Sequence, residues 1–105
     1  MKRNTRILLI LLAILLFLVL PGFYNSLTIP HYTAAAHDIE HPVRIALMTD
    51  LHSCAYGDGQ RELLDAIDAE DPDLILLGGD IFDDDLPDEN AAVLLRSIGD
   101  QYPCW

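Results

Sequence analysis

Basic residues are scarce in this chain beyond its first segment. Three of the six Lys and Arg residues lie beyond residue 30, namely Arg44, Arg61 and Arg96, whereas all seventeen Asp and Glu residues lie there. The formal net charge of this part is therefore −14. Such a charge disfavours binding to nucleic acid or to anionic lipid surfaces, and it favours a site that depends on cations.

Cysteine is also scarce, and the sequence has no internal repeats. Cys54 and Cys104 are the only two cysteines. If the domain lies outside the cytoplasm they could pair and close a loop of about fifty residues. Cys54 could instead be a soft additional metal ligand, or both could be unpaired small side chains. A disulfide depends on a Cα separation that spacing along the chain does not determine, so these three interpretations stay open.

Residues 1–24 have the composition of a membrane-targeting segment. Three of the first six residues are basic, and residues 7–20 are apolar without interruption. As a helix, Ile7–Tyr24 would span roughly 27 Å, close to the thickness of a bilayer core. Residues 22–28 offer no good cleavage site, so we expect a retained single-pass anchor, with a cleaved signal segment as the alternative. The basic start should stay in the cytoplasm, which places the remainder outside it, at the cell membrane.

Residues 25–42 are predicted to form a linker between this anchor and a domain over residues 43–105. The segment combines Ser, Thr and Pro with a short Ala run. His37 and His41 are four residues apart and would share a helix face, which suggests an accessory metal site. Pro42 and the mixed composition favour a polar tether instead.

Two short apolar runs, Val43–Met48 and Leu74–Leu77, are predicted to be strands buried in a parallel sheet, because they are branched-rich and bounded by Pro or Gly. Residues 60–69 between them have an apolar stripe with helical spacing. Strand, helix and strand follow one another here, as in the unit that joins parallel strands.

A second amphipathic helix is predicted over Ala91–Ile98, with Gly99 just past its end. Residues 101–105 then lead towards a third strand, so the fold class is α/β with a βαβαβ order. Four acidic residues before and at the start of this helix are interpreted as solvated groups stabilised by its dipole: Asp84, Asp85, Asp88 and Glu89.

An acidic motif follows each predicted strand. Asp50-Leu51-His52 follows the first strand, and Asp80 follows the second after two glycines. Residues i and i+2 of an extended segment point the same way, so Asp50 and His52 should approach one ion while Leu51 turns into the core. Asp80 should arrive beside them if the strands are neighbours, at the edge where open α/β sheets bind ligands. The glycines would let the backbone bend and leave room for substrate.

These motifs, Asp50-Leu51-His52 and Gly79-Asp80-Ile81-Phe82-Asp83, resemble the first two blocks of the calcineurin-like metallophosphoesterases, D-x-H and G-D-x-x-D. The resemblance covers residues 43–105 and implies the opening part of an α/β sandwich. It also implies that Asp50 and His52 bind a first metal ion and that Asp80 bridges two ions. Asp83 would match the acid that, in some members, orients a catalytic histidine; that histidine belongs to a third block, G-N-H-E or G-N-H-D, which this chain lacks.

The resemblance implies a metal-dependent hydrolase of phosphomonoesters, phosphodiesters or pyrophosphates, with two divalent ions in the complete domain. Mixed oxygen and imidazole ligands suit manganese, iron or zinc better than calcium. We expect the chain to be an N-terminal fragment that is inactive alone. The expected substrate is a phosphoester at the membrane or envelope, such as a lipid-linked phosphate; no nucleic-acid partner is expected.

Two alternatives remain beside this hypothesis. The first is an anchored remnant that binds a cation or a partner without turnover. The second is a different phosphotransfer fold with a magnesium pocket, in which Asp50 is a magnesium ligand or a phosphorylated carboxylate and His52 is incidental.

The basic start and the apolar run after it predict the topology. A reporter enzyme that is active only outside the cytoplasm, fused after Trp105, should be active. A reporter at that position that worked only inside the cytoplasm would contradict the outward assignment.

Overall fold

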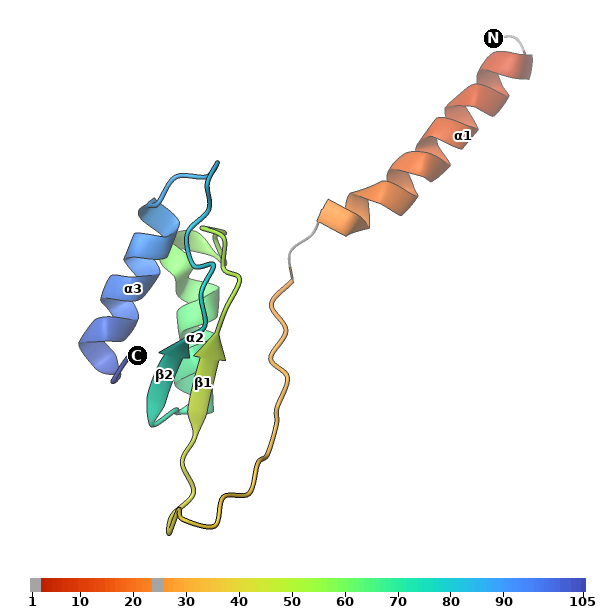
Figure 1. Cartoon of the computed structure of the whole chain (residues 1–105). Helices are drawn as coiled ribbons and strands as arrows, with labels where there is room; N and C mark the ends of the chain where they lie inside the picture. Colours follow the sequence, from red (N-terminus) through yellow and green to blue (C-terminus); the bar gives the residue numbers. More distant parts are fainter. Residues whose placement is uncertain (1–2, 24–25) are drawn as a thin grey trace. The chain divides into compact units, whose positions relative to one another are not determined.

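The computed structural model describes residues 3–23 and 26–105 of the chain (Figure 1). The chain divides into two compact units, Met1–Pro30 and His31–Trp105, and each unit is described by itself. The division reflects compactness alone, so the domain boundaries expected after residues 24 and 42 stay predictions.

The first unit is a single apolar helix. α1 (Arg3–Val19) continues into the 3₁₀ helix η1 (Leu20–Phe23), and α1 buries none of its side chains. Pro21 explains the change of helix type, since proline lacks an N–H donor and disfavours α geometry at the residue before it. Arg3–Gly22 is long and apolar enough to cross a membrane, a criterion that a signal sequence near an N-terminus also meets. Tyr24, expected to extend the helix, lies outside the described residues.

The second unit contains a parallel strand pair. β1 (Ile45–Met48) pairs with β2 (Leu74–Leu77) in the register Ile45 to Leu74, and α2 (Arg61–Glu70) lies between them in the sequence. This arrangement confirms the predicted strand-helix-strand order and the parallel pairing (Figure 1). β1 begins two residues later than expected. Arg44 N instead donates to the Asp73 carboxylate at 2.7 Å, and Asp73 N donates to Arg44 O at 2.8 Å.

The sheet is buried on one face only, which corrects the expectation that both strands are buried. Ile75 is fully buried, whereas Ile45 and Leu47 are 50% and 67% exposed on the opposite face. Residues from α2, α3 and the loops after the strands complete the core: Leu51, Leu63, Ile67, Ile81, Ala91, Leu94 and Ile98. The difference arises because helices cover one face, and no described segment of this unit buries the other.

α3 (Glu89–Gln101) is longer than the helix expected over 91–98, and Gly99 lies inside it rather than past its end. The helix stops where Tyr102 takes extended dihedrals, φ −127° and ψ 149°. Tyr102 precedes Pro103, and the proline ring disfavours helical geometry at the residue before it. Pro103, rather than Gly99, therefore ends this helix.

The residues after α3 lie beside β2. A single parallel bridge joins Ile75 to Cys104, and three backbone hydrogen bonds support it. These are Ile75 N to Pro103 O (2.9 Å), Trp105 N to Ile75 O (3.0 Å) and Leu77 N to Trp105 O (2.8 Å). The described residues thus form two strands plus one bridge at the expected position of a third strand. The complete βαβαβ order stays a prediction.

A side-chain contact secures this C-terminal segment to α2. The Tyr102 hydroxyl donates to Asp68 Oδ1 at 2.6 Å. This hydrogen bond to a carboxylate raises the pKa of Tyr102 above its ordinary value, because ionisation would break the bond and place two negative charges together.

Replacing Tyr102 should therefore have an effect that depends on pH. A raised pKa in the folded state contributes stability below the unfolded pKa of about 10, and this contribution is lost as pH rises through the folded value. We expect Tyr102→Phe to lower the free energy of unfolding at about pH 8, and its difference from wild type to shrink as the pH rises above about 10. Urea unfolding of the full chain in detergent, followed by circular dichroism, measures it.

Tyr32→Phe is the matched control, since Tyr32 is 90% exposed. If Tyr102→Phe lowered the free energy of unfolding by the same amount at low and at high pH, the proposed coupling of Tyr102 to Asp68 would be contradicted.

Candidate metal centre

The loops that follow β1 and β2 are held together by backbone hydrogen bonds past the ends of the strands. These bonds are Gly78 N to Met48 O (2.7 Å), Asp50 N to Gly79 O (3.1 Å), His52 N to Asp80 O (2.9 Å) and Ser53 N to Ile81 O (2.9 Å). The pairing begun by the strands is therefore extended by the loops. It brings the two acidic motifs into contact at the carboxyl edge of the sheet.

The backbone at these motifs is left-handed rather than extended. Asp50, His52, Ser53 and Asp80 have φ values of 57°, 49°, 52° and 52°. The expectation that Asp50 and His52 share a side of an extended segment is therefore wrong, although Leu51 between them is buried as expected, with 4% exposure. Each non-glycine residue in a sparsely populated region costs on the order of 1–3 kcal/mol, and such residues cluster at functional sites.

Two glycines make room for this arrangement. A Cβ at Gly78 would lie 3.2 Å from Thr49 Cβ, tighter than an ordinary contact, so glycine there eases the close approach of the two loops. Gly79 has φ 104°, a conformation that other L-residues rarely adopt. Thr49, which precedes the motif and had no predicted role, lies close to Gly78. Its hydroxyl donates to Asp50 Oδ2 at 2.9 Å and so fixes one oxygen of that carboxylate.

Asp50, His52 and Asp80 come together in the structure. One potential ligand atom from each lies within 4.8 Å of the other two, and all three residues are exposed. His52 Nε2 is 3.7 Å from Asp50 Oδ1. Three protein ligands and one open position are what a catalytic zinc ion takes, and two carboxylates with an imidazole also suit manganese or iron. The group thus fits one divalent cation, and the separate roles assigned to its members stay predictions.

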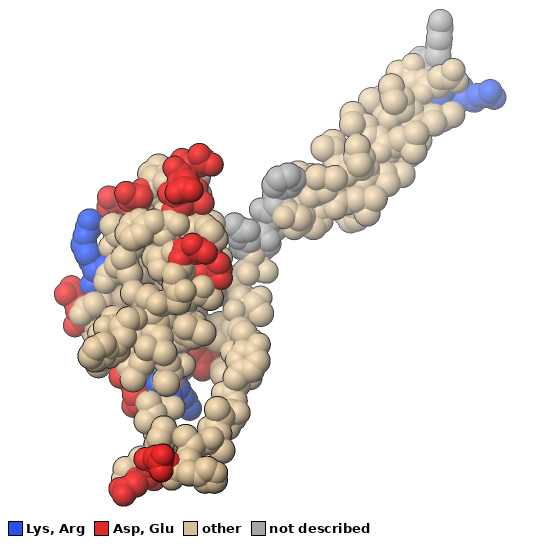
Figure 2. All heavy atoms as spheres, in the orientation of Figure 1, with Lys and Arg blue, Asp and Glu red and all other residues tan. Residues whose placement is uncertain are grey.

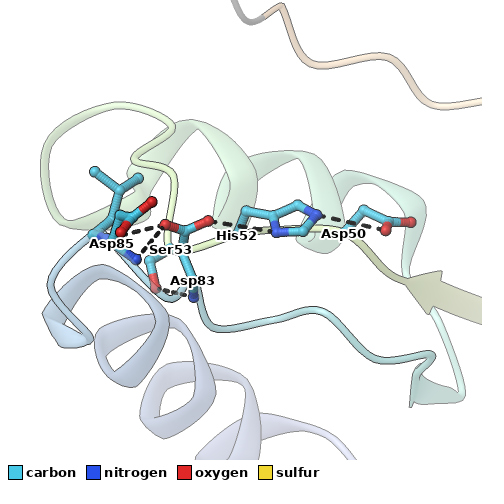
Figure 3. Close-up of polar contacts among 6 residues, drawn as sticks. Asp50, His52, Ser53, Asp83 and Asp85 are labelled. Carbon is cyan, nitrogen blue, oxygen red and sulfur yellow. Dashed lines mark hydrogen bonds and ion pairs between the residues drawn. The ribbon is translucent and has the colours of Figure 1, made fainter.

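Asp83 lies on the far side of His52 from Asp50 (Figure 3). Its Oδ2 accepts hydrogen bonds from Asp85 N at 2.9 Å and Leu86 N at 3.0 Å, and these bonds hold the pKa of Asp83 below its ordinary value. Its Oδ1 is 3.6 Å from His52 Nδ1. The expected role of Asp83, orienting a histidine absent from this chain, stays a prediction; the histidine it faces here is His52.

A buried polar network that no sequence motif predicted supports both loops. Ser53 and Gln60 are 0% and 1% exposed. Gln60 Nε2 donates to Cys54 O (2.8 Å) and Asn90 O (2.9 Å), and its Oε1 accepts from Tyr56 N (2.9 Å). Asn90 Nδ2 donates to Ser53 O at 3.1 Å. The first loop is thereby joined to the start of α3. The one sequence feature that could have indicated this is a glutamine at a helix start beside glycines.

The remaining candidates lie away from the three-residue group. Asp84, Asp85, Asp88 and Glu89 are exposed, which agrees with their interpretation as solvated acids. His37 and His41 are also exposed, and so is His31, whose Nε2 lies 2.9 Å from Glu70 Oε2 at the end of α2. Cys54 and Cys104 are both half-buried thiols.

Two carboxylates and an imidazole at the ends of adjacent parallel strands define the kind of centre that metal-dependent hydrolases use. Comparison with protein families is consistent with this geometry, since the model of the calcineurin-like phosphoesterases matches residues 43–104. The match covers more than half of the chain, and the chain belongs to this family. The resemblance noted from the D-x-H and G-D-x-x-D motifs is confirmed. A search of curated proteins and a search of solved structures each gave no match.

The geometry predicts that Asp80 is needed for cation binding. In the full chain in detergent, Asp80→Asn should weaken Zn²⁺ or Mn²⁺ binding by more than about 100-fold, because a neutral amide replaces one of two charged ligands. Isothermal titration calorimetry measures the affinity.

The control for this prediction is Glu89→Gln, which removes the same charge from a side chain that is 73% exposed and outside the group. Equal cation affinities for wild type and Asp80→Asn would remove Asp80 from the site.

Proposed function

We propose that the second unit contributes the first ligands of a two-metal centre for phosphoester hydrolysis. The observation that carries the proposal is the convergence of Asp50, His52 and Asp80 at the carboxyl ends of two parallel strands in a member of this family. Asp50 and His52 would hold one ion, and Asp80 would share its carboxylate between that ion and a second. When bound, such ions polarise a phosphoryl oxygen and stabilise the negative charge of the transition state.

The charge of the unit makes substrate binding depend on these cations. Residues 31–105 carry a formal net charge of −14, and a phosphoester is itself an anion. Without cations, the carboxylates of Asp50 and Asp80 would repel the phosphate group. The side chains of Asp50 and His52 are 62% and 48% exposed, so a cation held there would be accessible to a substrate from solvent.

The ligand count predicts that these residues are insufficient for turnover. Three side chains and a water fill about one four-coordinate shell, so a second ion would have only the shared carboxylate of Asp80. The other histidines, His31, His37 and His41, all precede β1 in the sequence. Activity should therefore require additional histidine ligands. The same shortage supports the second candidate function, cation binding without turnover.

We further propose that the apolar helix anchors the protein in the cell membrane, with the second unit outside the cytoplasm. Its length and composition and the basic residues at its start support this placement. Figure 2 shows the blue basic spheres of the first unit's described residues at one end of the helix. A substrate at the membrane or envelope, such as a lipid-linked phosphate or pyrophosphate, would suit an anchored phosphoesterase.

The test is a hydrolysis assay with manganese and an activated aryl phosphodiester. We expect no turnover from the 105-residue chain, and metal-dependent turnover from a version extended by a G-N-H-E block and later histidines. In the extended version, Asp80→Asn should reduce turnover by several orders of magnitude, because two close cations lose their shared charge.

Glu89→Gln in the extended version is the matched control and should change turnover little. The proposal would be overturned by an extended version that bound metal without turnover. Turnover by the short chain at a comparable rate would overturn the ligand-count argument.

A further inference from the structure

The imidazole of His52 lies between two carboxylates that come from different loops. Its Nε2 is 3.7 Å from Asp50 Oδ1, and its Nδ1 is 3.6 Å from Asp83 Oδ1 (Figure 3). The two ring nitrogens are distinct, and the partner of one nitrogen determines which proton the ring keeps and which nitrogen is left for a cation. Asp83 is the candidate for that partner, because Asp50 belongs to the group of potential ligands.

Asp83 is held in place independently of His52. Its Oδ2 is occupied by the backbone amides of Asp85 and Leu86, at 2.9 and 3.0 Å. Its own N–H donates to Ser53 Oγ at 3.2 Å, and Ser53 is fully buried. These three bonds leave Oδ1 as the oxygen that faces the imidazole. Asp83 is also less exposed than His52, with side-chain exposures of 26% and 48%.

We propose that Asp83 is a positioning residue for His52. Its carboxylate accepts a hydrogen bond from His52 Nδ1–H, so that Nε2 faces the cation held with Asp50 and Asp80. The proposal rests on the proposed metal site. The separation of 3.6 Å is longer than a formed hydrogen bond. Hydrogen bonds that orient site residues are often long before the ligand arrives and tighten with it.

Asp83→Asn separates this role from the structural role of Asp83. The amide oxygen can still accept from Asp85 N and Leu86 N, which keeps the turn and leaves an NH₂ group towards His52. A donor at that place favours the opposite tautomer, with the proton on Nε2 and Nδ1 as the acceptor. In this variant Nε2 should therefore carry the proton at the place where the cation would bind, while the loop stays folded.

The first measurement is the tautomer of His52 in the full chain in detergent, from ¹⁵N imidazole shifts at about pH 9, above the ordinary titration range of imidazoles. The signals are assigned by their loss in His52→Gln. We expect Nδ1–H in wild type and Nε2–H in Asp83→Asn. The second measurement is Zn²⁺ affinity, which should fall by about 10-fold or more in Asp83→Asn.

Asp84→Asn is the matched control, since it removes the same charge from the exposed neighbouring residue and should change neither readout by more than about 2-fold. An Nε2–H tautomer in wild type, or Nδ1–H in both proteins, would overturn the proposal, and the wild-type result needs no variant to fold. A tautomer change with no Zn²⁺ binding by wild type would instead support the positioning and overturn the proposed metal function.

Discussion

The candidate site depends on one constraint, the parallel pairing of β1 and β2 and its continuation into the loops. The register places Met48 opposite Leu77, so both strands end at the same edge. Backbone hydrogen bonds then run from Asp50 to Gly79 and from His52 to Asp80. These backbone bonds make neighbours of residues about thirty positions apart in the sequence. No direct contact between their side chains is needed. The carboxylates of Asp50 and Asp80 repel one another without a cation, and the backbone bonds help to hold the loops together against that repulsion.

This pairing imposes a conformational cost that the surrounding structure compensates. Asp50, His52 and Asp80 all adopt left-handed backbone, which is unfavourable for residues with a Cβ. Such a conformation persists when neighbouring contacts overdetermine it. Here Leu51 is buried in the core, and the buried Ser53 lies between Asp83 N and Asn90 Nδ2. The core therefore holds the loops in place while the three potential ligands themselves remain in solvent.

The sequence predicted the elements and the site residues better than it predicted the local geometry. The helix-length segment between two apolar runs predicted two parallel strands. Because parallel strands end at the same edge of a sheet, the sequence also predicted that Asp50, His52 and Asp80 lie together at that edge. The extended backbone expected at Asp50 was wrong. Asp and His adopt left-handed backbone more readily than most residues with a Cβ, but residue type alone does not say at which positions they do so. The end of α3 was misplaced for a related reason. Gly99 permits a helix end but does not require one, whereas Pro103 constrains the residue before it. The exposure of Ile45 depended on which segments cover the sheet, and local sequence does not specify that.

The distribution of exposure within the site links its structure to its chemistry. Asp83 is anchored by three bonds and is the least exposed of the acids around His52, while Asp50 has one oxygen tied to Thr49 and the other directed at the imidazole. An imidazole between two carboxylates can act as a cation itself or donate one nitrogen to a metal ion. A ring that keeps its proton at Nδ1 would offer the lone pair of Nε2 to a metal ion. The asymmetry between a fixed carboxylate at Nδ1 and a solvent-exposed carboxylate at Nε2 favours that outcome, because the ion can reach the second nitrogen without displacing the contact at the first.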